Sequence, residues 1–202
     1  MKKFCWFVVF ISLVISVASE WNEDCENPPD LNQYDGYCCH EDKFIGMEDI
    51  DNTEIIKECA EKFGLTVNNR NDVILTSETL EANLCFSECV FEANNYTENG
   101  TLNLDLMKID ARTYNHTENL NKLENIFINA IDLCGIKAEE KVTELKKLPN
   151  AEIYFKTNCS PTPLIFNECL AKEYYKNCPE EYWSKDIEDC KDARAYTIKC
   201  LV

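Results

Sequence analysis

The sequence predicts an all-α domain stapled by disulfides, and three observations lead to this prediction. From about residue 51 onward, apolar residues recur at the three- and four-residue spacing of amphipathic helices. Strand-like alternation is rare, and no Asn-Gly hairpin is expected to join two β-like runs. Of the 13 cysteines, Cys5 belongs to a predicted signal peptide, and the even number that remains predicts six disulfides.

Residues 1–19 are predicted to be a secretory signal peptide. Lys2 and Lys3 precede an apolar run over residues 4–17, and the small residues Ala18 and Ser19 suit a cleavage site. The run is short for a membrane span, and no later stretch approaches the roughly 20 apolar residues that a span requires. We therefore expect a secreted protein of one domain, residues 20–202, in extracellular fluid and without membrane insertion.

The net charge of the chain limits the kinds of partner that it can bind. The net charge is −17, and removal of the signal peptide with Lys2 and Lys3 makes it −19. Such an acidic protein repels phosphate backbones and anionic membrane surfaces. We therefore expect no nucleic-acid partner.

The stretch Leu84–Phe91 is predicted to be the centre of the domain. In a helix, Cys85 and Cys89 lie one turn apart on the same face, where their nearly parallel Cβ vectors suit a mutual disulfide poorly. Each of the two cysteines is therefore expected to pair with a different segment. Ser77 or Thr76 is expected to cap this helix.

The other elements are predicted from periodicity and from start and stop signals. Gly64 and Gly135 are expected to end two helices, and Pro179, which two acidic residues follow, is expected to start the last one. The domain divides into an N-terminal arm (20–51), a core helical bundle (52–178) and a C-terminal helix with its tail (179–202). The expected helices cover residues 51–63, 102–114, 120–134, 138–148, 164–176 and 179–194.

Three glycosylation sequons place the region around residues 95–115 on the surface. They begin at Asn95, Asn99 and Asn115. A fourth match begins at Asn158, but a disulfide at Cys159 would restrict access to it. We therefore expect glycans at the first three positions only.

The cysteine spacing is more specific than any single motif. From Cys59 to Cys190, eight cysteines are separated by 25, 3, 44, 24, 9, 8 and 11 residues, and Pro179 directly follows Cys178. This spacing resembles the insect odorant-binding proteins, in particular their Plus-C subgroup, which adds cysteines and a proline after the sixth core cysteine. The resemblance implies a compact bundle of about six or more helices around an apolar cavity, with pinned N- and C-terminal extensions.

The resemblance also implies how the cysteines pair. The implied core pairs are Cys59–Cys89, Cys85–Cys169, and Cys178 with either Cys134 or Cys159. The further bridges would then use Cys25, Cys38, Cys39, Cys190, Cys200 and whichever of those two remains.

By the same resemblance, the protein is a carrier of small hydrophobic molecules such as odorants, pheromones, other apolar semiochemicals or lipids. A carrier needs a cavity lined by large apolar and aromatic side chains with few polar groups. For each candidate, plain hydrophobic core is the competing interpretation, and the hydroxyl of Tyr174 or Tyr175 is a candidate for holding a polar ligand head. The candidate ligand-binding residues are Leu80, Leu84, Leu106, Met107, Leu123, Phe127, Ile131, Phe166, Leu170 and Tyr174.

Other functions are less well supported by the sequence. A chemoreceptor or a second copy of the chain is a candidate partner, and the rival function is a secreted interaction protein with a filled core. Catalysis by a Ser-His-Asp or Cys-His arrangement needs a histidine, but His116 lies within a sequon and His40 follows two cysteines. No Cys-x-x-Cys pair suggests zinc. We expect no enzyme activity, no cofactor and no metal site.

Overall fold

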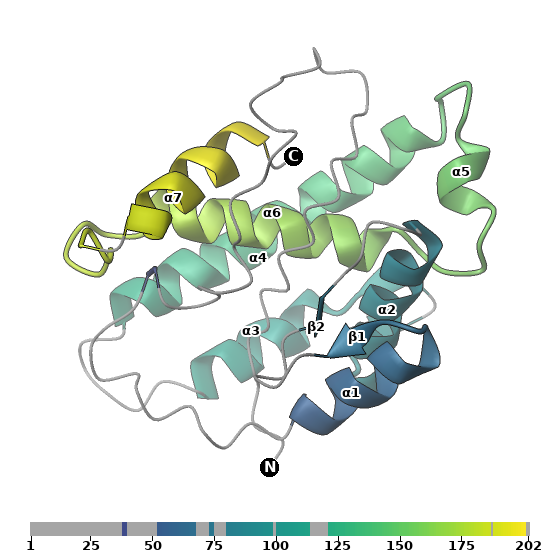
Figure 1. The fold of residues 1–202 in the computed structure, drawn as a ribbon, viewed down its shortest axis with the longest axis horizontal. Coiled ribbons are helices and arrows are strands. Elements are labelled where there is room, and N and C mark those ends of the chain that lie inside the picture. Colours follow the sequence, from purple (N-terminus) through teal and green to yellow (C-terminus); the bar gives the residue numbers. More distant parts are fainter. Residues whose placement is uncertain are drawn as a thin grey trace.

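The computed structural model describes residues 38–39, 52–67, 73–74, 80–98, 100–113, 121–186 and 188–200. This part of the chain is mostly helical, which confirms the predicted all-α class (Figure 1). Two small antiparallel pairs, β1 (Thr66–Val67) with β2 (Val73–Ile74) and β3 (Thr97–Glu98) with β4 (Thr101–Leu102), accompany the helices. The helices are α1 (Asn52–Lys62), α2 (Leu80–Ala93), α3 (Leu104–Thr113), α4 (Asn121–Leu145), α5 (Glu152–Phe155), α6 (Thr162–Asn177) and α7 (Glu188–Cys200).

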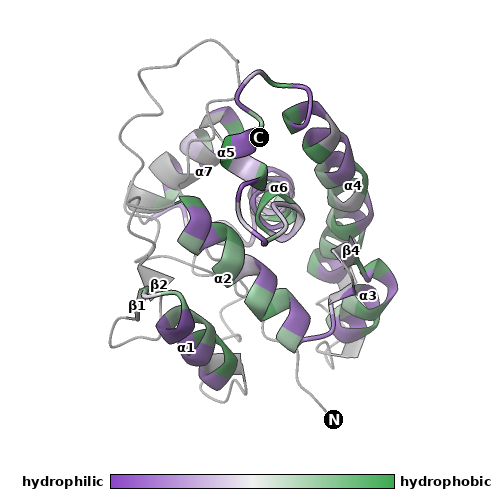
Figure 2. Cartoon of the chain, turned by 90° about the vertical axis from the view of Figure 1, so that its right-hand side faces the viewer, coloured by the Kyte–Doolittle hydropathy of each residue, from purple (hydrophilic) through white to green (hydrophobic). Residues whose placement is uncertain are grey.

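Helix α6 is the central element of the bundle. It packs against α2, α4 and α7, and Figure 2 looks along it with α2 and α4 on either side. Every residue from Thr162 to Ala171 is buried, as expected for a helix that is enclosed on all faces. The prediction that the stretch Leu84–Phe91 forms the centre was therefore wrong in position. That stretch lies in α2, which is cross-linked to two different segments as predicted.

Helix α1 ends at the predicted glycine. Gly64 has a φ of 70°, which a residue without a Cβ adopts at no steric cost. The N–H groups of Gly64 and Leu65 donate to the carbonyls of Glu61 and Ala60, which closes the helix in a Schellman motif. Leu65 then joins the buried cluster that packs α1 against α2.

Gly135 does not end a helix, contrary to the prediction. Helix α4 continues through it as one element and joins the two helices expected over residues 120–134 and 138–148. A Cβ at Gly135 would lie 2.4 Å from Cδ1 of Leu104, at the start of α3. The glycine therefore serves a close approach between α3 and α4 rather than a helix stop.

The prediction that no Asn-Gly hairpin joins two β-like runs was also wrong. Strands β3 and β4 pair Glu98 with Thr101, so the connection between the two strands is two residues long and ends in Gly100. Gly100 has a φ of 76°, as such a turn requires. Each strand is only two residues long, which is too short for its alternation to be recognised.

The last helix starts later than predicted. After Pro179 the chain forms a turn in which the N–H of Tyr182 donates to the Pro179 carbonyl, and α7 begins only at Glu188. Between Pro179 and α7, Trp183 forms an antiparallel bridge with Cys39 of the N-terminal arm. The N–H of Ser184 donates to the carbonyl of Cys38 at 2.9 Å. This pairing with a distant segment competes with helix formation and is invisible to local signals.

Five disulfides are present among the described residues, and only one was correctly paired in advance. Cys59–Cys89 is present as the resemblance implied. The implied Cys85–Cys169 bridge was wrong, because packing of α4 on α6 brings Cys134 and Cys169 together. Both alternatives for Cys178 were also wrong, because it pairs with Cys39 of the N-terminal arm. The observed remaining pairs are Cys85–Cys159, Cys134–Cys169, Cys39–Cys178 and Cys38–Cys190.

Several predictions lie outside the described residues. They include the signal peptide and most of the N-terminal arm. Also outside are the proposed helix caps Thr76 and Ser77 and the sequon residues Asn99 and Asn115. The same holds for Cys25 and for the side chain of Cys200.

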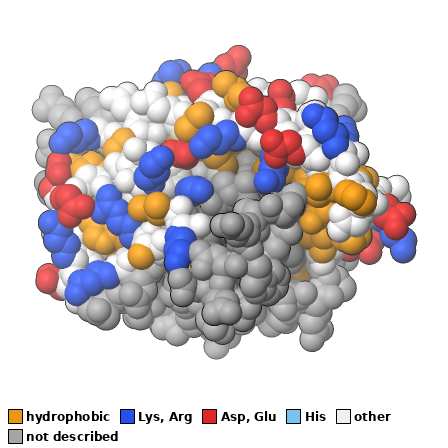
Figure 3. All heavy atoms as spheres, turned by 90° about the horizontal axis from the view of Figure 1, so that it is seen from above, with side chains coloured by type: hydrophobic (Ala, Val, Ile, Leu, Met, Phe, Trp, Pro, Cys, Tyr) orange, Lys and Arg blue, Asp and Glu red, His pale blue; other side chains and the backbone are white. Residues whose placement is uncertain are grey.

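The described surface carries mixed charge. Figure 3 shows Lys and Arg interspersed with Asp and Glu over the face seen from above. Ion pairs link neighbouring helices, such as Lys108 of α3 with Asp132 of α4 at 2.8 Å and Lys137 of α4 with Glu173 of α6 at 2.7 Å. None of the described helices is both long and apolar enough to span a bilayer.

Candidate ligand-binding interior

Most of the predicted ligand-binding residues meet in one apolar cluster, which we call the main core. It lies between α3, α4 and α6, with side chains of α2 at its edge. Five predicted residues are buried members of the main core, and three more pack against it while partly buried. The buried five are Met107, Phe127, Ile131, Phe166 and Leu170, and the other three are Leu80, Leu106 and Tyr174.

Two predicted residues lie elsewhere. Leu84 is fully buried against Leu164, where α2 meets the start of α6, and Leu80 links this contact to the main core. Leu123 lies in a separate cluster with Cys39 and Trp183, near the C-terminal end of α6. The structure therefore joins nine of the ten predicted residues through the main core and the adjoining Leu84–Leu164 contact.

Aromatic rings make the main core rigid where α2 and α6 meet. The centre of the Phe91 ring of α2 lies 5.9 Å from that of Phe166 and 6.1 Å from that of Tyr96, and both pairs pack edge to face. Phe127 of α4 contacts Tyr174 of α6 in the same way at 5.8 Å. Edge-to-face pairs stabilise by about 0.5–1.5 kcal/mol beyond their buried area.

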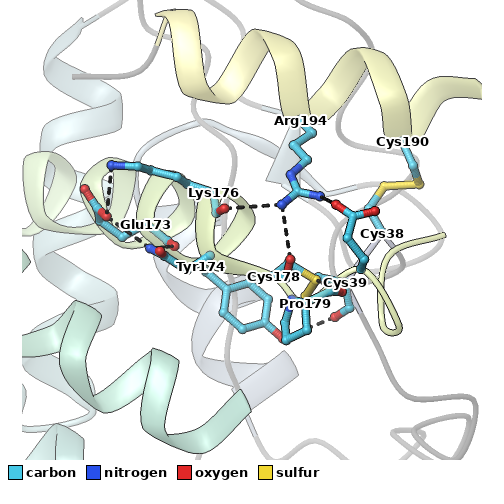
Figure 4. The surroundings of a disulfide bond; sticks show 11 residues. Cys38, Cys39, Glu173, Tyr174, Lys176, Cys178, Pro179, Cys190 and Arg194 are labelled. Atoms are coloured by element: carbon cyan, nitrogen blue, oxygen red, sulfur yellow. Dashed lines mark hydrogen bonds and ion pairs between the residues drawn. A yellow bond between two sulfur atoms is a disulfide. The ribbon is translucent and has the colours of Figure 1, made fainter. Parts of the chain in front are cut away.

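The hydroxyl of Tyr174 already has a hydrogen-bond partner outside the main core. It donates a hydrogen bond to the carbonyl of Cys39 at 3.1 Å (Figure 4). Burial raises the pKa of Tyr174 to about 12, so the hydroxyl stays protonated at physiological pH. Tyr174 thus connects the main core to the disulfides at the end of α6.

Those disulfides and the contacts around them form a second region, which we call the C-terminal staple. Adjacent cysteines of the N-terminal arm, Cys38 and Cys39, bind to Cys190 of α7 and to Cys178 after α6 (Figure 4). Arg194 of α7 completes the region. Its guanidinium lies 4.8 Å from the centre of the Trp183 ring and donates to the carbonyls of Lys176 and Cys178.

Three buried polar side chains have no hydrogen-bond partner among the described residues for at least one polar atom. They are Asn83 of α2, Thr97 of β3 and Glu168 of α6. For Asn83, which is 1% exposed, both the amide nitrogen and the amide oxygen lack a partner. Most buried polar groups in folded proteins are paired, so these three require an explanation.

Glu168 is buried in a neutral form. Burial raises the pKa of its carboxyl to about 8, although the charge of Lys141 opposes this rise. The pKa of Tyr196 of α7 is raised by burial and, to a smaller extent, by its closeness to Glu168. Glu168 therefore belongs to the contact between α6 and α7 rather than to the predicted ligand set.

Sequence reasoning missed Asn83 and Glu168 for a clear reason. Acids and amides are common on helix surfaces, so neither residue type indicates burial by itself. Only a helix that is covered on both sides, such as α2, or on all sides, such as α6, turns such a position into a buried one. The pattern of α6 in particular contains apolar residues around most of its circumference, which is the signal that indicates burial.

The fold and its interior define a class of small helical proteins that interhelical disulfides hold around an apolar core. The family model described as AgamOBP47-like matches residues 48–196, which is 149 of the 202 residues and spans α1 to most of α7. The chain therefore belongs to this family of insect odorant-binding proteins. Searches of the curated proteins and of the solved structures found no match.

Proposed function

We propose that the protein is a secreted carrier that reversibly binds small hydrophobic molecules, such as odorants, pheromones, other apolar semiochemicals or lipids, in its apolar interior. The observation that carries this proposal is the family match over nearly the whole helical bundle, because a small-ligand carrier role is general in that family. We further propose that the chain belongs to the Plus-C subgroup, which the Cys178–Pro179 step and the bridges of the C-terminal staple support.

The composition of the interior supports carriage of apolar molecules. The main core combines flexible and branched side chains such as Met107, Ile131 and Leu170 with the rings of Phe127 and Phe166. Such a lining binds apolar ligands of different shape without strong directional demands. Disulfides between α1 and α2 and between α4 and α6 fix the helices around it, so ligand exchange need not unfold the bundle.

Secretion and glycosylation are part of the proposal. Five disulfides among the described residues support an oxidising compartment, because such bonds do not persist in a reducing cytosol. We propose glycans at Asn95, Asn99 and Asn115. Asn95 is exposed at the end of α2 with a φ of 59°, which leaves its side chain accessible.

A second function is favoured by one surface observation. Ile109 of α3 is 53% exposed, and Leu133 and Ile136 of the neighbouring α4 are 40% and 59% exposed. Exposed apolar side chains on adjacent helices are typical of protein-binding faces. The alternative is therefore an interaction protein that binds a receptor or a second copy of the chain, and self-association of the wild type that Ile136→Asp abolishes would support it.

The carrier proposal is tested by binding of N-phenyl-1-naphthylamine to the oxidised, secreted protein, followed by competition with volatile alcohols, aldehydes and fatty acids. We expect saturable binding near micromolar concentration, displacement by some competitors, and loss of binding on reduction. Phe166→Ala changes the main core, whereas Ile153→Ala, on an exposed face of α5, is the matched control. A protein that binds no dye saturably would have a filled core, and the interaction function would then be preferred.

A further inference from the structure

We propose that the side-chain amide of Asn83 binds the polar group of the carried ligand, and that this ligand is an apolar molecule with one hydroxyl group. The inference rests on the proposed carrier function and adds the chemical class of the ligand and the residue that selects it. It starts from the two amide atoms of Asn83 that have no partner among the described residues.

Asn83 lies at a junction inside the bundle. Successive residues of a helix are 100° apart, so Asn83 stands between the side of α2 that carries Phe86 and the side that carries Leu84. Phe86 packs in the cluster with α1, and Leu84 packs against Leu164 of α6. Asn83 therefore stands between the face of α2 that packs on α1 and the face that packs on α6, and Ser87, one turn later and 5% exposed, lies beside it on the helix.

An amide in this position is expensive unless something binds it. A buried donor and a buried acceptor lose their water on folding, and without new hydrogen bonds that loss is not offset. A leucine has nearly the same volume and would remove this cost. The amide is therefore best explained by a hydrogen-bonding group that enters after folding.

The chemistry of the amide selects the ligand. The nitrogen of Asn83 donates and the oxygen accepts, so a hydroxyl group, which does both, satisfies the two atoms together. An ether or an aldehyde can only accept, and a hydrocarbon can do neither. A charged head finds no compensating charge among the buried residues of α2, which are Asn83, Leu84, Cys85, Phe86 and Ser87.

Three ligands with the same number of heavy atoms test this selection: decanol, methyl nonyl ether and undecane. Their affinities are measured by displacement of N-phenyl-1-naphthylamine from the full-length mature protein. We expect the wild type to bind decanol at least about tenfold more tightly than undecane, with the ether between them, as one good buried hydrogen bond allows. Asn83→Leu is expected to bring decanol and undecane within about twofold of each other.

Asn94→Leu is the matched control. It makes the same change near the end of the same helix, but the Asn94 amide nitrogen already donates to the carbonyl of Val90 at 2.8 Å. The control is expected to keep the full preference for decanol. If Asn83→Leu keeps that preference too, the inference is overturned while the carrier function stands, and a buried water is then the partner of the amide. If neither the wild type nor any variant binds a probe, both proposals fail.

A spectroscopic measurement on the wild type covers the case in which Asn83→Leu does not fold. In wild-type protein labelled with ¹³C and ¹⁵N, triple-resonance spectra assign the side-chain signals of Asn83. Decanol is expected to shift these signals, whereas undecane is expected to leave them in place and Asn94 serves as the internal reference. Signals of Asn83 that do not respond to decanol would overturn the inference.

Discussion

The main core and the C-terminal staple hold the same helix in two different ways. In the main core, α6 is held by apolar contacts and aromatic edges between helices that the sequence pattern already marks. In the C-terminal staple, the end of α6 is held by the Cys39–Cys178 disulfide, whose partners are 139 residues apart, and by hydrogen bonds to backbone carbonyls. The Cys38–Cys190 disulfide, with partners 152 residues apart, joins the same arm to α7. The first kind of contact depends on local periodicity, and the second depends on where distant segments meet.

The difference suggests a division of roles. The main core sets most of the free energy of unfolding because hydrophobic burial scales with apolar area. The C-terminal staple restricts how far the N-terminal arm and α7 can move, because crosslinks act mainly on the conformations of the unfolded or locally opened chain. Four predictions test whether the two regions separate in this way.

The largest effect is expected in the main core. Phe166→Ala removes a ring that is 1% exposed and in contact with Phe91, so it should lower the free energy of unfolding by about 3–5 kcal/mol. Guanidinium unfolding measures this change. Ile153→Ala, which truncates a side chain that is 51% exposed, should change stability by no more than about 0.5 kcal/mol. Similar values for the two variants would mean that the main core is not the principal source of stability.

The next effect concerns the two disulfides of the C-terminal staple. Replacing Cys38 and Cys190 with serine should cost little, because the neighbouring Cys39–Cys178 bridge still closes nearly the same loop. Replacing all four cysteines should cost about 2–5 kcal/mol, more than the two pairwise losses added together.

Hydrogen exchange distinguishes where that loss occurs. In the four-serine variant, exchange should accelerate in α7 and leave α4 and the middle of α6 protected. The Cys134→Ser and Cys169→Ser double variant is the comparison, because it breaks the bridge inside the main core. Uniform loss of protection in the four-serine variant would contradict the separation of the two regions.

The third effect depends on pH and arises from Glu168, between the two regions. Its carboxyl keeps its proton up to a pH of about 8 in the folded protein, because burial outweighs the charge of Lys141, whereas the unfolded chain releases the proton near the ordinary pKa of 4.5. The folded state therefore binds more protons between these values, and the free energy of unfolding falls as pH rises from about 4.5 to about 8. Above the upper value the loss is complete.

Glu168→Gln should remove this part of the pH dependence. The variant should be more stable than the wild type at pH 9 and close to it at pH 4. Glu173→Gln should have the opposite effect and lower stability at neutral and higher pH. Burial raises the pKa of Glu173, but this rise is outweighed by the lowering effects, the largest of which is the hydrogen bond from Lys137. The net pKa is therefore lowered, and the ionised form of Glu173 stabilises the fold. Parallel pH curves for the wild type and Glu168→Gln would contradict the buried neutral carboxyl.

How much of this could be predicted follows the same division. The stripe before Gly64 and the α6 residues Phe166 and Leu170 were recognised because a helix that buries one face repeats apolar residues locally. The pairing of Cys85 and the turn at Pro179 were mispredicted, because a disulfide partner or a bridge to Cys39 is decided by the packing of segments far apart in sequence. No local rule contains that information.

Glycine and asparagine show the same limit at single positions. Gly64 and Gly135 look alike in the sequence, yet one ends α1 with a positive φ and the other lies within α4 beneath Leu104. Asn83 lies in α2 and Asn94 directly follows it, yet one is unpartnered among the described residues and the other donates to the carbonyl of Val90. Residue type gives the chemistry that is available, and packing decides which chemistry is used.

The smallest effect is expected at Arg194 in the C-terminal staple. Arg194→Lys keeps the charge but loses the planar group that lies over Trp183 and donates to two backbone carbonyls, so the free energy of unfolding should fall by about 1 kcal/mol. Glu180→Gln removes the charge of the exposed carboxylate that pairs with Arg194 and with Lys185, and it should have a smaller effect, which added salt diminishes further. A larger loss for Glu180→Gln than for Arg194→Lys would show that the surface ion pair, rather than the stacking and the carbonyl contacts, fixes α7 to the end of α6.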